Sequence, residues 1–144
     1  MKNLAILTGM ILSFAVMSNA QSQNKVTVNV PFDFYVQDQK MAAGEYTLTS
    51  VSRQTSPNQL GIVSKTGSSS QIVSTMLVDL PRSSSPADAT LVFNRYGDTY
   101  VLAKIVNPRE QTGFTVLKTK SEQTLAKTFG KPKQETVSLT TGSH

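Results

Sequence analysis

Cysteine is absent from the 144 residues of this chain, and its absence excludes several kinds of chemistry at once. A chain without thiols forms no disulfide bond, offers no thiol nucleophile and provides no cysteine ligand for zinc or an iron–sulfur cluster. If the protein is exported, as its first residues indicate, it must be stabilised by packing alone.

Histidine is almost as scarce, because the only one is His144, the last residue. A side chain at a chain end lacks the neighbours that would fix its orientation, which makes it a poor base or metal ligand. The sequence also lacks a G-x-S-x-G nucleophile motif, a glycine-rich phosphate loop and a D-x-D-x-D-G calcium loop. We therefore predict no enzyme activity, no cofactor and no metal, although two carboxylates could still support glycoside hydrolysis.

The first twenty residues have the pattern of a secretory signal peptide. Lys2 supplies the positive charge, Leu4 to Val16 is an apolar stretch too short to span a bilayer, and Ala20 completes a small-residue cleavage pattern. Cleavage after residue 20 would leave 144 − 20 = 124 residues with 14 − 1 = 13 basic and 9 acidic side chains. We predict a periplasmic or extracellular protein without a transmembrane segment in the mature chain; an uncleaved anchor is the alternative.

Short runs of β-branched and aromatic residues, separated by Gly, Ser, Asn, Asp or Pro, fill most of the remaining chain. This spacing predicts a single all-β domain over 21–130, an antiparallel β-sandwich of about seven strands with one short C-terminal helix. A small β-barrel is the alternative. The run at 70–80 carries apolar residues of both parities, which predicts a central or doubly covered strand. The predicted strands lie at 25–37, 45–52, 60–66, 70–80, 90–106 (a hairpin) and 114–119.

Residues 25–37, KVTVNVPFDFYVQ, alternate regularly, because every even position from Val26 to Val36 is apolar. Pro31 cannot donate to a strand ladder, so we expect an edge position or a bend between sheets. Asp33 shares the outward parity and should be solvated, without a raised pKa. The expected core includes Val26, Val28, Phe34, Phe93 and Leu102.

The clearest local pattern is the hairpin at 90–106, in which Gly97-Asp98 separates two strand-like runs. Glycine at the first central position suits a type II′ turn, because that position needs a positive φ. Exposed aromatic and Arg side chains near the turn could anchor a partner. The alternative is cross-strand stabilisation, with Arg95 lying over the ring of Tyr100. The candidate contact residues are Arg95, Tyr96, Asp98 and Tyr100, and the predicted register pairs Phe93 with Leu102, Arg95 with Tyr100 and Val92 with Ala103.

The hydrophobic period changes to that of a helix after residue 120. Ser121 can cap this helix, which ends near Gly130 and should dock through Leu125 and Phe129 because a short helix does not persist alone. The basic, Ser/Thr-rich tail at 131–144 follows. It is expected to add an edge strand at 136–140 or to be disordered.

Basic residues concentrate around this helix and tail. They could contact an anionic surface such as lipid head groups, glycans or nucleic acid. The alternative is a solvated charged face, because acidic residues interrupt the run. The candidate residues are Lys118, Lys120, Lys127, Lys131 and Lys133.

Four segments, in the same order, resemble a family of small exported β-rich proteins from acidobacteria-like soil bacteria. They are VPFDF (30–34), AAGEYTL (42–48), LVFNRYGDTYVLAKI (91–105) and GFTVLKTKSEQTLAK (113–127). The family has no assigned function, so the resemblance implies export and a β-rich fold and adds no mechanism. This chain departs from the family pattern at Ala42-Ala43 and at Val106, where a tryptophan is usual. The shorter stretch GEYTL (44–48) is similar to the start of a strand in transthyretin-like sandwiches.

Two functional hypotheses follow from these patterns. The first is a non-catalytic exported envelope protein, a binding or structural module whose partner is a protein or glycan of the cell envelope. The second is a lipocalin-like carrier, which would hold a small apolar ligand inside a barrel and must therefore leave an interior cavity. Neither hypothesis includes specific binding of nucleic acid.

Overall fold

The computed structural model describes residues 26–50, 59–79, 88–107 and 111–139, in which ten strands and one helix form an all-β fold. The predicted fold class is confirmed. The strands exceed the expected seven because the run at 25–37 divides into two and further strands form at 39–41 and 133–138. The elements are β1 (Val26–Val30), β2 (Phe34–Val36), β3 (Gln39–Met41), β4 (Gly44–Ser50), β5 (Gln59–Ser64), β6 (Ser70–Asp79), β7 (Thr90–Tyr96), β8 (Thr99–Asn107), β9 (Thr112–Val116), α1 (Lys120–Phe129) and β10 (Lys133–Ser138).

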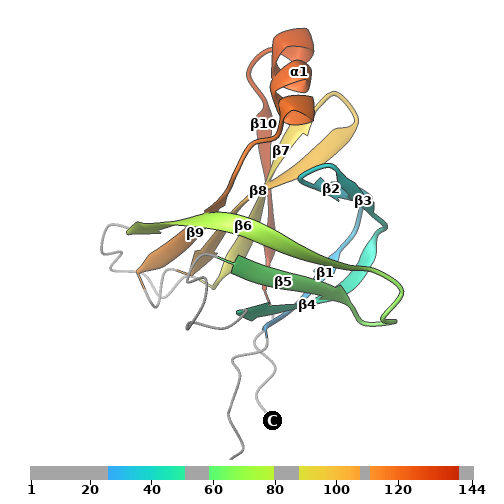
Figure 1. The fold of residues 1–144 in the computed structure, drawn as a ribbon, viewed down its shortest axis with the longest axis vertical. Helices are drawn as coiled ribbons and strands as arrows, with labels where there is room; N and C mark the ends of the chain where they lie inside the picture. The colour runs from blue at the N-terminus through green and yellow to red at the C-terminus, as the bar shows by residue number, and fades with distance from the viewer. Residues whose placement is uncertain (1–25, 51–58, 80–87, 108–110, 140–144) are drawn as a thin grey trace, which may run out of the picture.

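The strands form two layers that are joined by β6. The first layer contains β1, β4, β5 and the first half of β6, and the second half of β6 continues through β9, β8, β7 and β10. Figure 1 shows β6 crossing the front of the molecule between these layers. Among the described strands β1 pairs only with β4 and β10 only with β7, so the sheet is open, as in a sandwich, and does not close into the alternative barrel.

Pro31 lies at the bend between the two layers, which is one of the two positions expected for it. The strand before it, β1, pairs with β4 in the first layer. The strand after it, β2, pairs with β3 and also lies parallel to β8 through Tyr35 and Val101 in the second layer. A proline fits here because the chain leaves one ladder before it joins the next.

Asp33 is solvated, as predicted, and it also fastens this bend. Its carboxylate accepts a hydrogen bond of 2.9 Å from the backbone N–H of Ala43 and lies 3.2 Å from the Lys40 ammonium. The Ala43 hydrogen bond and then Lys40 hold the pKa of Asp33 below its ordinary value of 3.8. Asp33, which faces outward as the alternation predicts, therefore links the start of β2 to the turn before β4.

Aromatic rings fill the space between the layers. Phe34 is 1% exposed and makes edge-to-face contacts with Tyr46 and Phe93, at centroid distances of 5.2 and 5.3 Å. Phe32 stacks on Tyr100 at 4.0 Å and extends this cluster. Of the expected core residues, Val28, Phe34, Phe93 and Leu102 are fully buried and Val26 packs against them from the edge.

The β7–β8 hairpin has the predicted turn and most of the predicted register. Gly97 has φ 59 at the first central position, and Phe93 pairs with Leu102. The prediction that Val92 pairs with Ala103 was wrong, because the register shifts between Val92 and Phe93 and Val92 pairs with Lys104. Such a shift places an extra residue in one strand and alters which side chains face the core.

The helix begins and ends close to the predicted residues, but its cap differs. Thr119, and not Ser121, is the N-cap, and its hydroxyl accepts a hydrogen bond from the N–H of Glu122. Gly130 ends the helix at φ 77 and donates to the carbonyl of Ala126. In the tail, the predicted edge strand is present as β10 at 133–138, antiparallel to β7, slightly earlier than expected.

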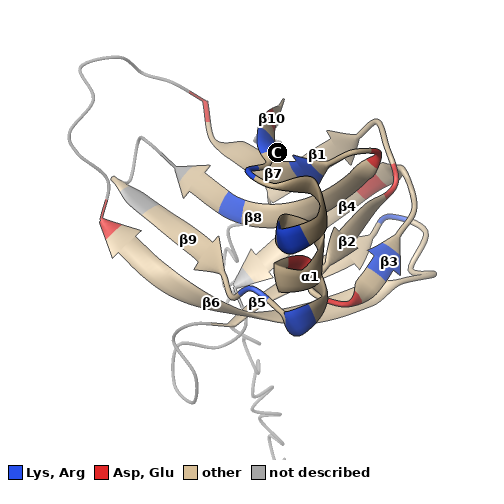
Figure 2. Ribbon diagram, turned by 90° about the horizontal axis from the view of Figure 1, so that it is seen from above, with Lys and Arg blue, Asp and Glu red and all other residues tan. Residues whose placement is uncertain are grey.

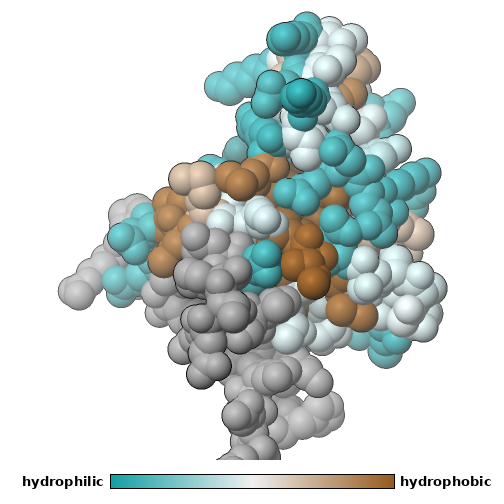
Figure 3. Space-filling model, in the orientation of Figure 1, coloured by the Kyte–Doolittle hydropathy of each residue, from teal (hydrophilic) through white to brown (hydrophobic). Residues whose placement is uncertain are grey.

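Strand β6 is central, because it pairs with β5 on one side and β9 on the other. It is not doubly covered, since Ile72 and Met76 on its outer face are 59% and 56% exposed. Figure 3 shows apolar surface where β6 crosses the front of the molecule. Of the two alternatives that the sequence pattern left open, β6 is therefore the central strand and not the strand covered on both faces.

Replacing Phe34 by alanine should destabilise the protein by about 3–5 kcal/mol, because the change removes a fully buried ring from the aromatic cluster. Urea unfolding followed by circular dichroism measures the loss. The control is Ile72→Ala on the exposed face of β6, which should cost no more than about 1 kcal/mol. Equal losses for the two variants would show that Phe34 is not part of the core.

Candidate functional site

Helix α1 is attached to the sheet by a buried carboxylate. Glu122, in the first turn, is only 5% exposed and its Oε1 accepts two hydrogen bonds. One comes from the side-chain amide of Asn94 at 2.9 Å and the other from the hydroxyl of Tyr96 at 3.1 Å. Both donors lie on β7 and are themselves buried. The carboxylate can be buried here without a large free-energy penalty, because it accepts hydrogen bonds from two buried donors that would otherwise lack an acceptor.

This attachment differs from the predicted one. Leu125 is half-buried, whereas Phe129, the second expected docking residue, is 56% exposed. Its ring nevertheless covers the β7–β8 turn, since a Cβ built on Gly97 would lie 3.0 Å from Phe129 Cε1. The main anchor is Glu122, an acidic residue of the first helical turn that was not among the predicted docking residues.

Tyr96 responds electrostatically to this burial. Burial, and then the neighbouring charge of Glu122, raises the pKa of Tyr96 above its ordinary value of 10.0. Tyr96 keeps its proton more firmly in the folded state than in the unfolded one. Its contribution to stability is therefore present below pH 10.0 and is lost as the pH rises through the raised pKa.

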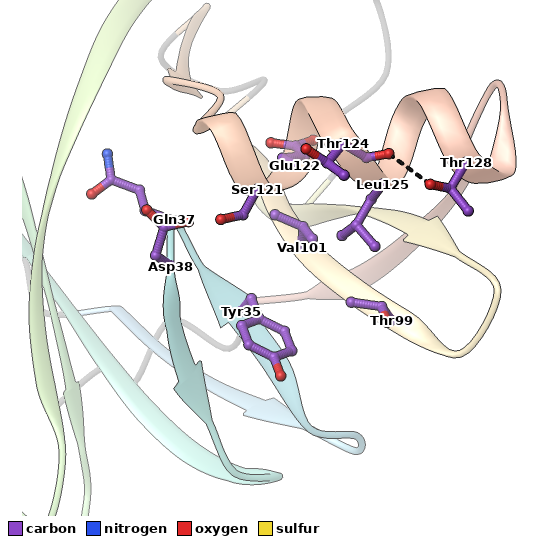
Figure 4. A pocket seen from close by; sticks show the side chains of 10 residues that line it. All are labelled: Tyr35, Gln37, Asp38, Thr99, Val101, Ser121, Glu122, Thr124, Leu125 and Thr128. Atoms are coloured by element: carbon purple, nitrogen blue, oxygen red, sulfur yellow. Dashed lines mark hydrogen bonds between the residues drawn. The ribbon is translucent and has the colours of Figure 1, made fainter.

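A first pocket, which we call the hairpin pocket, lies between α1 and the β2–β3 hairpin and has a volume of about 470 Å³. Figure 4 shows the side chains of Val101 (β8) and Leu125 (α1) on one side of it and Tyr35 on β2. The polar groups come from the β2–β3 turn and from the helix. The lining consists of Tyr35, Gln37, Asp38, Thr99, Val101, Ser121, Glu122, Thr124, Leu125 and Thr128.

Two residues of the β2–β3 turn give the hairpin pocket its polar rim. Gln37 has φ 56, in the left-handed region that glycine adopts at little cost and other residues rarely do. Asp38 is exposed and has no ion-pair partner among the described residues. Ser121 approaches this turn from the helix (Figure 4). This end of the pocket therefore combines a strained backbone at Gln37 with the polar groups of Asp38 and Ser121.

A second pocket, which we call the lysine pocket, has a volume of about 490 Å³. It lies over β8, β9 and β10, and three lysines contribute to it from separate segments: Lys104, Lys118 and Lys131. The hairpin pocket and the lysine pocket share Glu122. The remaining lining residues are Asn94, Ala103, Thr115, Val116, Pro132 and Gln134.

The predicted basic residues do not form a single surface. Lys118 and Lys131 line the lysine pocket, and Lys131 with Lys133 borders a smaller pocket of about 270 Å³ beside Arg95 and Phe129. The helix residues Lys120 and Lys127 are exposed and line neither pocket. Figure 2 shows basic residues distributed over the helix and the neighbouring strands.

Lys104 was missed by the sequence reasoning. It is an exposed residue of β8 opposite Thr115 of β9, a position that the strand pairing shows and the local sequence does not. It lies near the other two lysines only because the fold brings β8 beside the segments before and after α1.

The predicted contact residues of the hairpin tip point in different directions. Tyr96 is buried under α1, and Tyr100 is partly buried and stacks on Phe32 beside the core. Arg95 lies 5.3 Å from the Tyr100 ring centroid, which is the cross-strand alternative, and it reaches Asp98 at 3.9 Å. Of the four, only Tyr96 is fully buried; Asp98 is exposed, and Arg95 and Tyr100 keep part of their surface for a partner to contact.

Comparisons with known proteins return nothing: no family model, curated protein or solved structure matches this chain. The resemblance to exported proteins of soil bacteria stays a prediction. In the described part of the chain, no helix is long and apolar enough to cross a membrane, and no three His, Cys, Asp or Glu residues gather as metal ligands.

Glu122→Gln should lower the pKa of Tyr96 without returning it to 10.0, because the change removes a neighbouring charge and leaves the burial. Tyrosinate absorbance during a pH titration, with the Tyr96→Phe variant subtracted, isolates this residue. An unchanged Tyr96 pKa in Glu122→Gln would contradict the hydrogen-bonded pair.

Proposed function

We propose that this chain is an exported, non-catalytic protein of the cell envelope that binds a glycan in the hairpin pocket. The observation that supports the ligand class is the combination of an apolar floor with an unpaired polar rim. Val101 and Leu125 form the floor, and Gln37, Asp38 and Ser121 belong to the rim. Export rests on the pattern of residues 1–20 and on the family resemblance.

A sugar ring suits this arrangement chemically. It has an apolar C–H face, which packs on aromatic and aliphatic side chains, and a border of hydroxyls, which need both donors and acceptors. The Tyr35 ring, together with the floor, offers the first kind of surface, and a carboxylate and an amide on the β2–β3 turn offer the second. The pocket volume of about 470 Å³ lies within the usual range for small-ligand sites.

The backbone of Gln37 supports a role in binding. A residue other than glycine in the left-handed region costs about 1–2 kcal/mol. Glycine at this turn would avoid that cost, yet the chain carries a long amide side chain there, at the rim of the pocket. Strain of this kind persists at functional sites where the side chain contributes to binding.

The non-catalytic part of the proposal rests on how the two carboxylates of the pocket are held. Glycoside hydrolysis needs one carboxyl as an acid and a second as base or nucleophile. Asp38 is exposed, whereas Oε1 of Glu122 already accepts bonds from Asn94 and Tyr96 beneath the helix. We therefore expect binding without turnover.

The apolar-ligand carrier stays a prediction without a supporting observation. Such a carrier needs a cavity between the layers, and that space holds the buried side chains of Phe34, Phe93 and Leu102. The two larger pockets lie instead beside α1.

Gln37→Gly should weaken binding of neutral oligosaccharides at least about fivefold, while stability stays the same or rises by up to about 1 kcal/mol because the strain is relieved. Calorimetric titration of the full chain with a panel of neutral oligosaccharides measures the first effect, and urea unfolding measures the second. The matched control is Gln39→Ala, on the same hairpin, exposed and outside the pocket lining.

Two results would contradict the proposal. If no oligosaccharide binds, or if Gln37→Gly and Gln39→Ala bind equally, the hairpin pocket is not a glycan site. If chromatography shows cleaved oligosaccharide that Asp38→Asn no longer produces, the protein is catalytic.

A further inference from the structure

The three ammonium groups of the lysine pocket lack acidic partners. Elsewhere in the described chain, Lys40 pairs with Asp33, Lys65 pairs with Glu45, and Arg95 pairs with two acids. No such ion pair within the described ranges involves Lys104, Lys118 or Lys131. The fold thus places three positive charges around one pocket and leaves them uncompensated.

The one acidic residue of this lining does not neutralise them. Glu122 is buried, and its Oε1 is occupied by Asn94 and Tyr96 on the sheet side. It is the only residue of α1 in this lining, and it offers little exposed surface to a ligand. Apart from Glu122, the lining consists of the three lysines and of neutral residues: Asn94, Ala103, Thr115, Val116, Pro132 and Gln134.

Like charges that border one pocket without counter-charges repel one another, and an anion bound among them reduces that repulsion. The lysines come from β8, from the segment before α1 and from the segment after it. An anion in the pocket would therefore contact three parts of the chain at once. A monovalent anion matches only one of the three charges, so a multivalent oxyanion suits the site better.

We propose that the lysine pocket is a binding site for a small multivalent oxyanion, a polycarboxylate or a polyphosphate, held by Lys104, Lys118 and Lys131. This site differs from the hairpin pocket in every lining residue except Glu122. The inference does not depend on the glycan proposal. The two pockets require opposite chemistry, since the rim of the hairpin pocket carries an unpaired carboxylate.

The experiment titrates the full chain with citrate and, separately, with pyrophosphate by calorimetry at low salt. We expect binding of at least one probe, weakened by added salt because exposed charges are screened. Each of the variants Lys104→Gln, Lys118→Gln and Lys131→Gln should lose up to about fivefold in affinity, the usual limit for one exposed ion pair. Binding of citrate alone indicates carboxylate chemistry, binding of pyrophosphate alone indicates phosphate chemistry, and binding of both indicates a general oxyanion site.

The matched controls are Lys120→Gln and Lys127→Gln, which change the net charge equally but lie outside the pocket lining. Trimethyl citrate, the uncharged triester, serves as the control ligand. The proposal is overturned if neither anion binds, if the control lysines matter as much as the pocket lysines, or if the triester binds as well as citrate. If oligosaccharides bind and neither anion does, only the oxyanion proposal is wrong. If an anion binds and no oligosaccharide does, only the glycan proposal is wrong.

Discussion

The arrangement of this protein's surface depends on one buried carboxylate. Glu122 accepts hydrogen bonds from Asn94 and Tyr96 on the sheet, and these contacts hold a helix that has little apolar surface of its own. A helix of ten residues is too short to persist unaided. Because α1 forms a wall of the hairpin pocket and its Glu122 also lines the lysine pocket, the shape of both pockets depends on these three side chains.

The sandwich beneath supplies rigidity that such a site needs. Its aromatic cluster, centred on Phe34, closes the space between the layers, and the bend at Pro31 carries the chain from one layer to the other. The chain has no cysteine, so packing stabilises this sandwich without disulfides. On this base, the helix separates two surfaces of contrasting charge, one bordered by Asp38 and the other by lysines.

Sequence patterns predicted those features that depend on residues close together in the chain. Alternation located most strands, and Gly97 located the hairpin turn, because both are local. The shift at Val92 was missed, since apolar residues stand at consecutive positions in both strands and fit either register. The anchor was missed for a related reason: Glu122 meets partners 26 and 28 residues away, and an acid in a first helical turn has an ordinary local explanation. Lys104 likewise joins the other lysines only after folding.

The central claim is that Glu122 holds the helix in place, and hydrogen exchange of the native protein tests it most directly. In Glu122→Ala, the amides of α1 should lose protection by roughly tenfold or more, because two buried donors lose their acceptor at a cost of about 1–3 kcal/mol. The amides of β4 and β5, in the layer that α1 does not contact, should keep their protection. If α1 exchanges as slowly in Glu122→Ala as in the unaltered protein, the helix is held by something else and this account of both pockets is wrong.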